Sequence, residues 1–294
     1  MIGGPGDAEV PGLSPEDAEG VARALARRLP PALVPLFDAS FVYSTRLYDE
    51  FVHRLAVGVF RAAGLEAAAR QAGSVEEIAA RAGLEAGRAR VPLDWLLRQL
   101  AARQVLEAEG VESQRRFRLR GPLPVLDPAA IREAQRRHDP AALPSYVLAE
   151  TVARDYPAFL RGEVGGEDVL FSPARCRLWF DYFTNDNGLY AVNNRVGAIA
   201  VEQWLPRSGA AILELGGGLG SASAALLGRL AEAGRLAEVG TYRFTELVPL
   251  FLRRGQRALE QRFPGASFLT FAELDMNRPF AEQGIGPGSV AVVY

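Results

Sequence analysis

The sequence contains no lysine, very little cysteine or histidine, and no long apolar run. All 33 of its basic residues are arginine, which points to genomic base composition more than to chemistry. The single cysteine, Cys176, cannot form an internal disulfide, and two scattered histidines give no metal-ligand spacing, so no metal site is expected. No apolar stretch approaches the ~20 residues that span a bilayer. The N-terminus also lacks the basic and apolar regions of a secretory signal, so we expect a cytoplasmic protein with no membrane partner.

The overall composition is that of a globular protein. Of the 294 residues, 49% are hydrophobic and 23% are charged, which leaves ample material for a buried core. The formal net charge of −2 argues against a globally basic nucleic-acid-binding protein, although a local basic patch stays open. A chain of this length suggests about two domains.

The first part of the chain predicts helices. Residues 1–13 are rich in glycine and proline and predict a flexible tail, after which Ser14 and Pro15 form a typical helix start. Apolar residues four apart predict a second long helix over 44–63. Ser74 and Glu77 predict a capping box at the start of a short helix. Between 74 and 119, this helix, an apolar helix and two alternating segments follow one another. That order predicts a winged-helix module.

The pattern changes near residue 210. A short apolar run is followed by a glycine-rich loop and a helix, and further short strands then alternate with helices. This alternation predicts an α/β fold with a parallel, doubly wound, Rossmann-like sheet. The expected strands cover 211–215, 242–245, 267–271 and 289–294.

The glycine-rich loop is the strongest chemical signal. Gly216, Gly218 and Gly220 allow a sharp turn and a close approach of a ligand to the backbone. Ser221 stands where the dinucleotide fingerprint would have its third glycine. Glu214, two residues before the loop, suits a ligand with an ammonium group, such as S-adenosylmethionine. A loop that only connects strand to helix remains the alternative.

Acidic residues follow the next two strands. Glu246, at the end of the second strand, can accept hydrogen bonds from both hydroxyls of a ribose. Asp275, after the third strand, can accept from an adenine amino group, with Leu274 and Met276 against the ring. A solvated loop position is the alternative for each residue alone, but the three signals occur at successive strand ends in the right order.

These segments carry a family resemblance. Residues 210–294 resemble the first half of a class I S-adenosylmethionine-dependent methyltransferase, and more closely the methyltransferase domains of polyketide and non-ribosomal peptide synthases. The similar segments are ILELGGGLGSASAALL at 212–227, YRFTELVPLFL at 242–252 and FAELDMNRPFAEQGIGPGS at 271–289. The resemblance implies S-adenosylmethionine as the cofactor. It places Glu214, Gly216, Gly218, Gly220, Glu246 and Asp275 in the cofactor site.

The resemblance has two departures. Val290 and Ala291 stand where the family has a tyrosine-aspartate pair, and the sequence ends at Tyr294, before the family's acceptor-side residues. We therefore expect a sheet truncated after its fourth strand. The catalytic base is unknown, because no position exists to receive it.

The resulting hypothesis divides the chain into a tail at 1–13, a helical and winged-helix region at 14–168 for the acceptor and dimerisation, and a cofactor-binding region at 169–294. The predicted activity is methyl transfer to a small-molecule or carrier-bound, polyketide-like intermediate. One alternative is a cofactor-binding fragment that is inactive by itself.

A second alternative is a DNA-binding regulator. Arginines cluster around the winged-helix module, but its apolar helix argues against nucleic-acid binding. The clustered arginines are Arg98, Arg103, Arg115, Arg116, Arg118 and Arg120.

A homodimer is also expected. The apolar helix at 93–100 and the stripe from Leu47 to Val59 offer more apolar surface than one small module can bury. The tryptophans Trp95, Trp179 and Trp204 are expected in the core.

Overall fold

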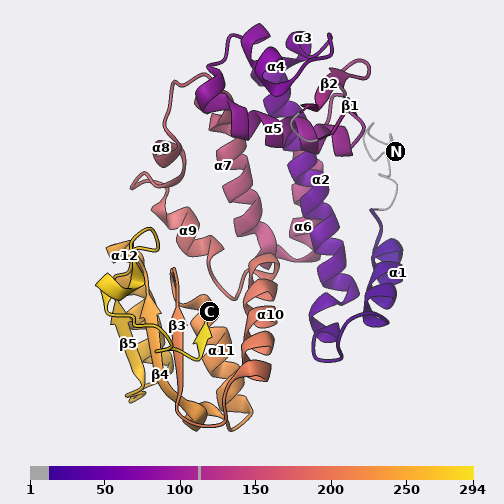
Figure 1. Cartoon of the computed structure of the whole chain (residues 1–294). Coiled ribbons are helices and arrows are strands. Elements are labelled where there is room, and N and C mark those ends of the chain that lie inside the picture. The colour runs from indigo at the N-terminus through magenta and orange to yellow at the C-terminus, as the bar shows by residue number, and fades with distance from the viewer. Residues whose placement is uncertain (1–12, 112–113) are drawn as a thin grey trace. The chain divides into compact units, whose positions relative to one another are not determined.

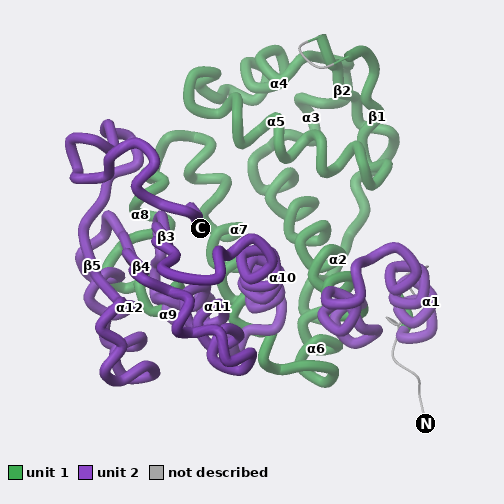
Figure 2. The backbone as a smooth tube through the Cα atoms, turned by 60° about the horizontal axis from the view of Figure 1, so that its bottom comes forward, with its two compact units in different colours: residues 1–14, 43–179 green, residues 15–42, 180–294 purple. Residues whose placement is uncertain are grey.

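A computed structural model describes residues 13–111 and 114–294 of the chain (Figure 1). All of the predicted flexible tail except its last residue lies outside the described part. The chain divides into two compact units (Figure 2), of which unit 1 comprises residues 1–14 and 43–179 and unit 2 comprises residues 15–42 and 180–294. The sequence hypothesis instead divided the chain at 168/169 and assigned the first helix to the N-terminal region.

Unit 1 is built of helices and one small hairpin, in the order expected from the sequence. Its first long helix, α2, begins five residues before the predicted position, because the Asp38 side chain caps it by accepting from the Phe41 N–H at 2.8 Å. The elements are α2 (Ala39–Ala62), α3 (Leu65–Ala68), α4 (Val75–Arg81), α5 (Ala86–Ala102), β1 (Leu106–Glu109), β2 (Arg116–Leu119), α6 (Pro128–His138), η3 (Pro140–Ala142), α7 (Leu143–Leu160), α8 (Gly166–Leu170) and α9 (Cys176–Tyr182).

The apolar side chains of α5 form the core of unit 1. Leu93, Leu97 and Leu100 of this helix are buried in one cluster, which also contains Val59 of α2 and Phe117 of β2. The leucines of the predicted apolar helix are therefore buried in this cluster, and the homodimer stays a prediction. The prediction that the α5 tryptophan is in the core is wrong, since Trp95 is 44% exposed.

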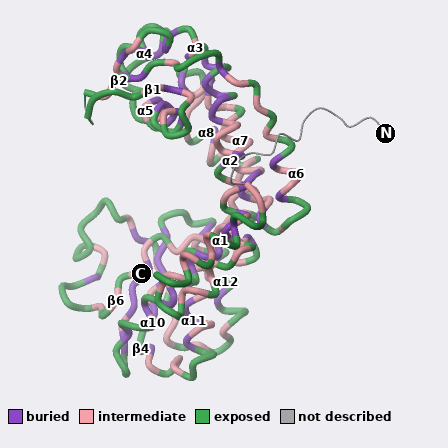
Figure 3. The backbone as a smooth tube through the Cα atoms, turned by 90° about the vertical axis from the view of Figure 1, so that its right-hand side faces the viewer, coloured by how far each residue is buried: buried purple, intermediate pink, exposed green. Residues whose placement is uncertain are grey.

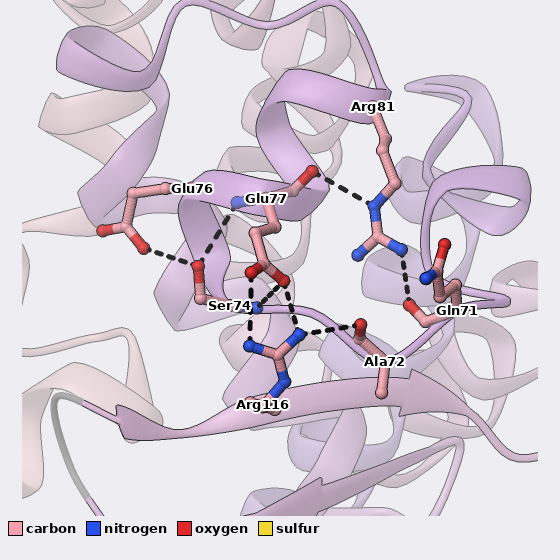
Figure 4. Close-up of polar contacts among 7 residues, drawn as sticks. All are labelled: Gln71, Ala72, Ser74, Glu76, Glu77, Arg81 and Arg116. Atoms are coloured by element: carbon pink, nitrogen blue, oxygen red, sulfur yellow. Dashed lines mark hydrogen bonds and ion pairs between the residues drawn. The ribbon is translucent and has the colours of Figure 1, made fainter.

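The hairpin is fastened to the start of α4 (Figure 4). Gly73, just before this helix, bridges Phe117 of β2, and Arg116 donates two hydrogen bonds to the Glu77 carboxylate, at 2.6 and 3.2 Å. Glu77 also completes the predicted capping box with Ser74. The helix, helix and hairpin of the predicted module are therefore present in order. Their description as a winged helix stays a prediction.

Most of the arginines around this module are ion-paired with neighbouring carboxylates. The exception is Arg115, for which the described residues include no carboxylate partner. Such internal pairing leaves little unbalanced positive charge for DNA phosphates. The pairs are Arg98–Asp94, Arg103–Glu50, Arg116–Glu77, Arg118–Glu107 and Arg120–Glu107.

Unit 2 contains the predicted sheet together with a short N-terminal segment. Its helices and strands alternate from β3 onward as the sequence predicts. The elements are α1 (Pro15–Ala26), η1 (Val34–Phe37), α10 (Gly188–Trp204), β3 (Ala210–Glu214), α11 (Ser221–Glu232), η4 (Leu236–Glu238), β4 (Val239–Thr245), α12 (Pro249–Arg262), β5 (Leu269–Ala272), η5 (Phe280–Gln283) and β6 (Val292–Val293).

The four strands form one parallel sheet in the order β5-β4-β3-β6, which confirms the predicted α/β class. The chain adds strands in one direction from β3 to β5 and then crosses back to place β6 on the other side of β3. This reversal makes the β3/β6 junction a topological switch point. In open parallel sheets, ligands bind at the carboxyl ends of the strands beside such a point.

One face of the sheet packs against helices. Ile212, Tyr242 and Phe244 point into a core shared with α10, α11 and α12. The opposite face, represented by Leu213, packs against segment 273–291 in a smaller cluster with Leu274 and Ile285. Figure 3 shows how burial is distributed along the chain.

The last tryptophan of unit 2 corrects another expectation. Trp204, at the end of α10, is 82% exposed and does not belong to the core. No helix in the described part of the chain has both the length and the apolar composition needed to cross a membrane.

Candidate cofactor-binding site

The glycine-rich loop joins β3 to α11 at the carboxyl edge of the sheet. Gly216 and Gly218 have positive φ angles of 67° and 58°, which side chains rarely tolerate. A Cβ on Gly216 would meet only the Met276 methyl group, at 3.9 Å, and one on Gly218 only the Gly216 carbonyl oxygen, at 4.0 Å. Both positions therefore offer bare backbone beside unfilled space, which is what a closely approaching ligand needs.

The other loop glycines pack against the protein. A Cβ on Gly217 would lie 2.2 Å from the Phe244 ring, and one on Gly220 would lie 3.2 Å from Leu259 of α12. The Gly217 N–H also donates to the Thr245 carbonyl at 2.8 Å, which fixes the loop to the end of β4. Gly220, predicted as a ligand contact, thus supports the loop by close helix packing, as the third glycine does in nucleotide-binding loops.

Glu246 follows β4 and closes against the loop. Its Oε2 accepts a hydrogen bond from the Gly218 N–H at 2.9 Å, and its Oε1 accepts from the Val248 N–H at 2.8 Å. The side chain is only 7% exposed. Because β4 adjoins β3 in a parallel sheet, Glu246, the residue predicted to bind a ribose, lies beside the glycine loop as the sequence analysis expected.

Asp275 and Met276 stand in the loop after β5. The Asp275 Oδ1 accepts from both the backbone N–H and the side-chain amide of Asn277, at 2.8 and 3.0 Å. Gln283 pairs with the backbone of Asp275 and holds this loop in place. Met276 is 60% exposed, and its methyl group is the atom nearest to the Cβ position of Gly216. The loops that follow β3, β4 and β5 therefore contribute residues to one site at the carboxyl edge of the sheet.

Glu214, the last residue of β3, lies beneath this surface. Its carboxylate is 2% exposed, and its Oε2 accepts hydrogen bonds from the Ser223 hydroxyl and, at 2.8 Å, from the Tyr242 hydroxyl. The Ser223 N–H also bonds to it. Burial raises the pKa of Glu214, while these hydrogen bonds partly oppose the rise. Its direct contact with an ammonium group stays a prediction.

A segment before the sheet is tied to the start of α11. Ser221 donates through its hydroxyl to the Phe183 carbonyl at 2.6 Å, and its own carbonyl accepts from the Asn185 amide at 2.8 Å. Asn194, which is buried, donates in turn to Asn185 at 2.8 Å. The neighbouring Asn193 is exposed.

Two site residues escaped the sequence analysis. The hydroxyls of Ser223 and Tyr242 donate hydrogen bonds to the Glu214 carboxylate. In the sequence, Ser223 has the pattern of an ordinary helix residue and Tyr242 that of a core residue in a strand. A buried acidic residue at a strand end, which must find hydrogen-bond donors, was the available signal. Among the described residues, no cluster of histidine, cysteine and acidic side chains has a geometry suited to a metal ion.

The site geometry fits an S-adenosylmethionine-like ligand. It offers open loop backbone at Gly216 and Gly218, the Glu246 carboxylate for a diol and the Met276 side chain for an aromatic ring. The carboxyl group of Glu214 lies buried below the loop.

Solved structures share this fold. The chain is similar to the CurJ carbon methyltransferase, with a TM-score of 0.68 and 20% identity over 94% of this chain and 70% of that one. It is also similar to the DszA carbon methyltransferase, with a TM-score of 0.59 and 24% identity over 93% of this chain and 66% of that one. For the CMeT domain of the citrinin polyketide synthase, the TM-score is 0.59 and the identity 18% over 90% of this chain and 68% of that one.

These likenesses show a methyltransferase fold and confirm the predicted fold class. The chain spans about two thirds of the length of the three similar proteins. No protein-family model and no curated protein matches the sequence.

Proposed function

We propose that the chain is an S-adenosylmethionine-dependent methyltransferase of natural-product biosynthesis. The observation that carries the proposal is the convergence of Gly216, Gly218, Glu246 and Met276 at the carboxyl ends of three neighbouring parallel strands. The likeness of the fold to two carbon methyltransferases and to a polyketide synthase CMeT domain supports it.

Each residue has a distinct part in this proposal. Glu246 accepts from the ribose hydroxyls, and the Asp275–Met276 loop lies against the adenine. The glycine loop lets the ligand reach the backbone, and Glu214 interacts with the ammonium group of the donor. When bound, S-adenosylmethionine supplies an electrophilic methyl group, so the chain's residues act mainly by positioning the donor and the acceptor.

For the acceptor, we propose a small or carrier-bound polyketide-like molecule that is methylated at carbon. Two of the similar structures are carbon methyltransferases and a third is a polyketide synthase CMeT domain, which supports this choice. A cofactor-binding fragment without activity of its own is the second candidate, supported by a cofactor site whose parts all come from strands β3 to β5.

Calorimetry tests the cofactor part of the proposal. The chain should bind S-adenosylhomocysteine and not NADH, and Glu246→Ala should weaken binding by about 1–3 kcal/mol because hydrogen-bonding groups are left unpaired. Glu260→Ala, on the exposed face of α12, serves as the control. Binding of NADH without S-adenosylhomocysteine would contradict the proposal.

Activity distinguishes the two candidates. Incubation with S-adenosylmethionine and a β-ketoacyl thioester, followed by mass spectrometry, should show the addition of one methyl group for an active enzyme. Cofactor binding without a methylated product would favour the inactive fragment.

A further inference from the structure

Helix α12 concentrates positive charge on its exposed face. It begins three residues after Glu246, and its sequence contains four arginines and a single acidic residue. Arg253, Arg254 and Arg257 are exposed. Arg253 and Arg257 are four residues apart, and like charges at that spacing repel each other and destabilise a helix. The fold of this chain therefore gains nothing from placing these charges together.

Within the described residues, no carboxylate forms an ion pair with these three arginines. The only acidic residue of α12, Glu260, accepts a hydrogen bond from the Gln256 amide at 2.8 Å instead. Arg254 lies over the Phe180 ring, 3.8 Å from its centroid, a contact that leaves the guanidinium charged. The ion pairs described between residues 180 and 294 are formed by Arg207, Arg229, Arg235 and Arg278.

Aliphatic side chains lie beside this charge. Leu247, Val248 and Leu250 are 45%, 41% and 36% exposed, and all three lie between Glu246 and the arginines in the sequence. Leu250 shares a helix face with Arg254 and Arg257, which follow it by four and seven residues. Exposed apolar side chains next to arginine are characteristic of protein–protein interfaces.

We propose that the exposed face of α12, together with Leu247 and Val248, is the docking surface for an acidic carrier protein that holds the methyl acceptor as a thioester. Carboxylates of the carrier would pair with Arg253 and Arg257, because the planar guanidinium group binds a carboxylate with two hydrogen bonds. The inference rests on the proposed function, since only a carrier-bound acceptor needs a protein docking surface. The α12 surface begins next to Glu246, so a docked carrier stands at the edge of the cofactor site.

A nucleic acid is the other polyanion that exposed arginines attract. Its affinity comes mainly from many phosphate contacts, whereas this surface offers three arginines on a chain of formal net charge −2. The exposed leucines and valine also have no part in binding phosphates. The observations therefore favour an acidic protein.

Fluorescence anisotropy with a purified, dye-labelled acyl carrier protein of acidic composition tests the proposal. The unmodified chain should bind this probe, and its affinity should fall at least about fivefold between ~50 and ~300 mM NaCl, because salt screens exposed charges. Arg253→Glu/Arg257→Glu reverses the charge of the surface and should weaken binding at low salt at least about tenfold. An unmodified chain that does not bind the carrier, or a variant that binds it equally well, would overturn the proposal.

Arg27→Glu/Arg28→Glu is the matched control. These two arginines follow α1 in the same unit, are exposed, and give the same change of net charge when replaced. The control variant should bind the carrier as the unmodified chain does. A loss equal to that of Arg253→Glu/Arg257→Glu would assign the effect to net charge and contradict a docking surface on α12.

Calorimetry with S-adenosylhomocysteine separates this inference from the proposed function. Arg253→Glu/Arg257→Glu should bind S-adenosylhomocysteine normally, which also shows that the variant is folded. If it does not fold, Arg257→Gln, a milder change at the same surface, should weaken carrier binding about threefold, and unchanged binding would overturn the inference.

Two further outcomes are decisive. A chain that binds S-adenosylhomocysteine but not the carrier would overturn the inference and leave the proposed function standing, whereas a chain that binds neither would contradict both. Tighter binding of a single-stranded RNA than of the carrier, lost in Arg253→Glu/Arg257→Glu, would assign the α12 surface to nucleic acid and overturn the proposal.

Discussion

The side-chain amide of Gln283 pairs with both backbone polar groups of Asp275. Its Oε1 accepts from the Asp275 N–H and its Nε2 donates to the Asp275 carbonyl, both at 2.8 Å. A glutamine eight residues away thus imitates a neighbouring strand and shapes the loop that carries Met276. The Arg243 guanidinium bonds the Gln283 carbonyl at 3.1 Å and joins this arrangement to β4.

Gln283→Ala should weaken S-adenosylhomocysteine binding roughly fivefold to twentyfold, because two hydrogen bonds of about 1 kcal/mol each position the loop. Calorimetry measures the change. Gln261→Ala, at an exposed position of α12, is the matched control and should bind normally. An unchanged affinity in Gln283→Ala would show that the loop keeps its shape without this pair.

Alanine at two adjacent loop glycines should have different effects. Gly217→Ala brings a Cβ within 2.2 Å of the fully buried Phe244 ring, so the variant should lose about 1–3 kcal/mol or more of unfolding free energy. Gly218→Ala brings its Cβ into no such contact, so it should lose only the ~1–2 kcal/mol of unfolding free energy that a left-handed backbone costs a residue with a side chain.

Urea unfolding and calorimetry separate these two effects. Gly217→Ala should be the less stable variant, whereas Gly218→Ala should fold and lose affinity for S-adenosylhomocysteine. The opposite order of stabilities would mean that the Phe244 ring can move aside, and normal binding by Gly218→Ala would place the ligand elsewhere.

The hairpin of unit 1 offers a comparison between a buried ring and an exposed ion pair. Phe117→Ala should cost about 3–5 kcal/mol, because the ring is fully buried in the unit 1 core. Arg116→Ala should cost less than ~1 kcal/mol, since the Arg116 and Glu77 side chains are 47% and 52% exposed. Thermal unfolding of both variants tests this ranking. A larger loss of stability in Arg116→Ala would show that the polar contacts of Arg116 stabilise the hairpin more than the buried ring does.

Glu214 should give stability a distinct pH dependence. Its pKa is raised by burial above the ordinary value of 4.5, so the folded chain binds this proton more tightly than the unfolded chain does. The contribution of Glu214 to the unfolding free energy is therefore complete below pH 4.5 and declines as the pH rises through the folded-state pKa. The exposed carboxylates paired with arginine, such as Glu77, contribute in the opposite direction.

Comparison with Glu214→Gln isolates this contribution. The unfolding free energy of the unmodified chain, minus that of the variant, should rise as the pH falls from 8 toward 4.5. Urea titrations at several pH values measure it. A difference that stays flat over this range would show that Glu214 is not titrating.

Much of the fold followed from local sequence signals. The Ser74 capping box, the hairpin and the strand–helix alternation after residue 210 all depend on neighbouring residues, and each appears as predicted. Glu246 and the glycine loop were brought together correctly because parallel strands end at one edge. These features needed no knowledge of distant contacts.

The missed features depend on distant partners. Tyr242 reaches Glu214 only because Ile212 of β3 is in register with Tyr242 of β4, a pairing that no local pattern encodes. The burial of the α5 leucines depends in the same way on what the rest of unit 1 supplies. The exposure of Trp204 shows that residue type alone did not decide burial.

Gly255, in the middle of α12, links the glycine-rich loop to cooperative folding. A Cβ there would lie 2.6 Å from the Phe244 ring and 3.1 Å from the Gly218 carbonyl oxygen. Helix α12, strand β4 and the glycine-rich loop are therefore in close contact at this glycine. Local opening of α12 would therefore release the loop as well. A ligand that touches the loop alone should slow amide hydrogen exchange along α12, because it stabilises the same cooperative unit.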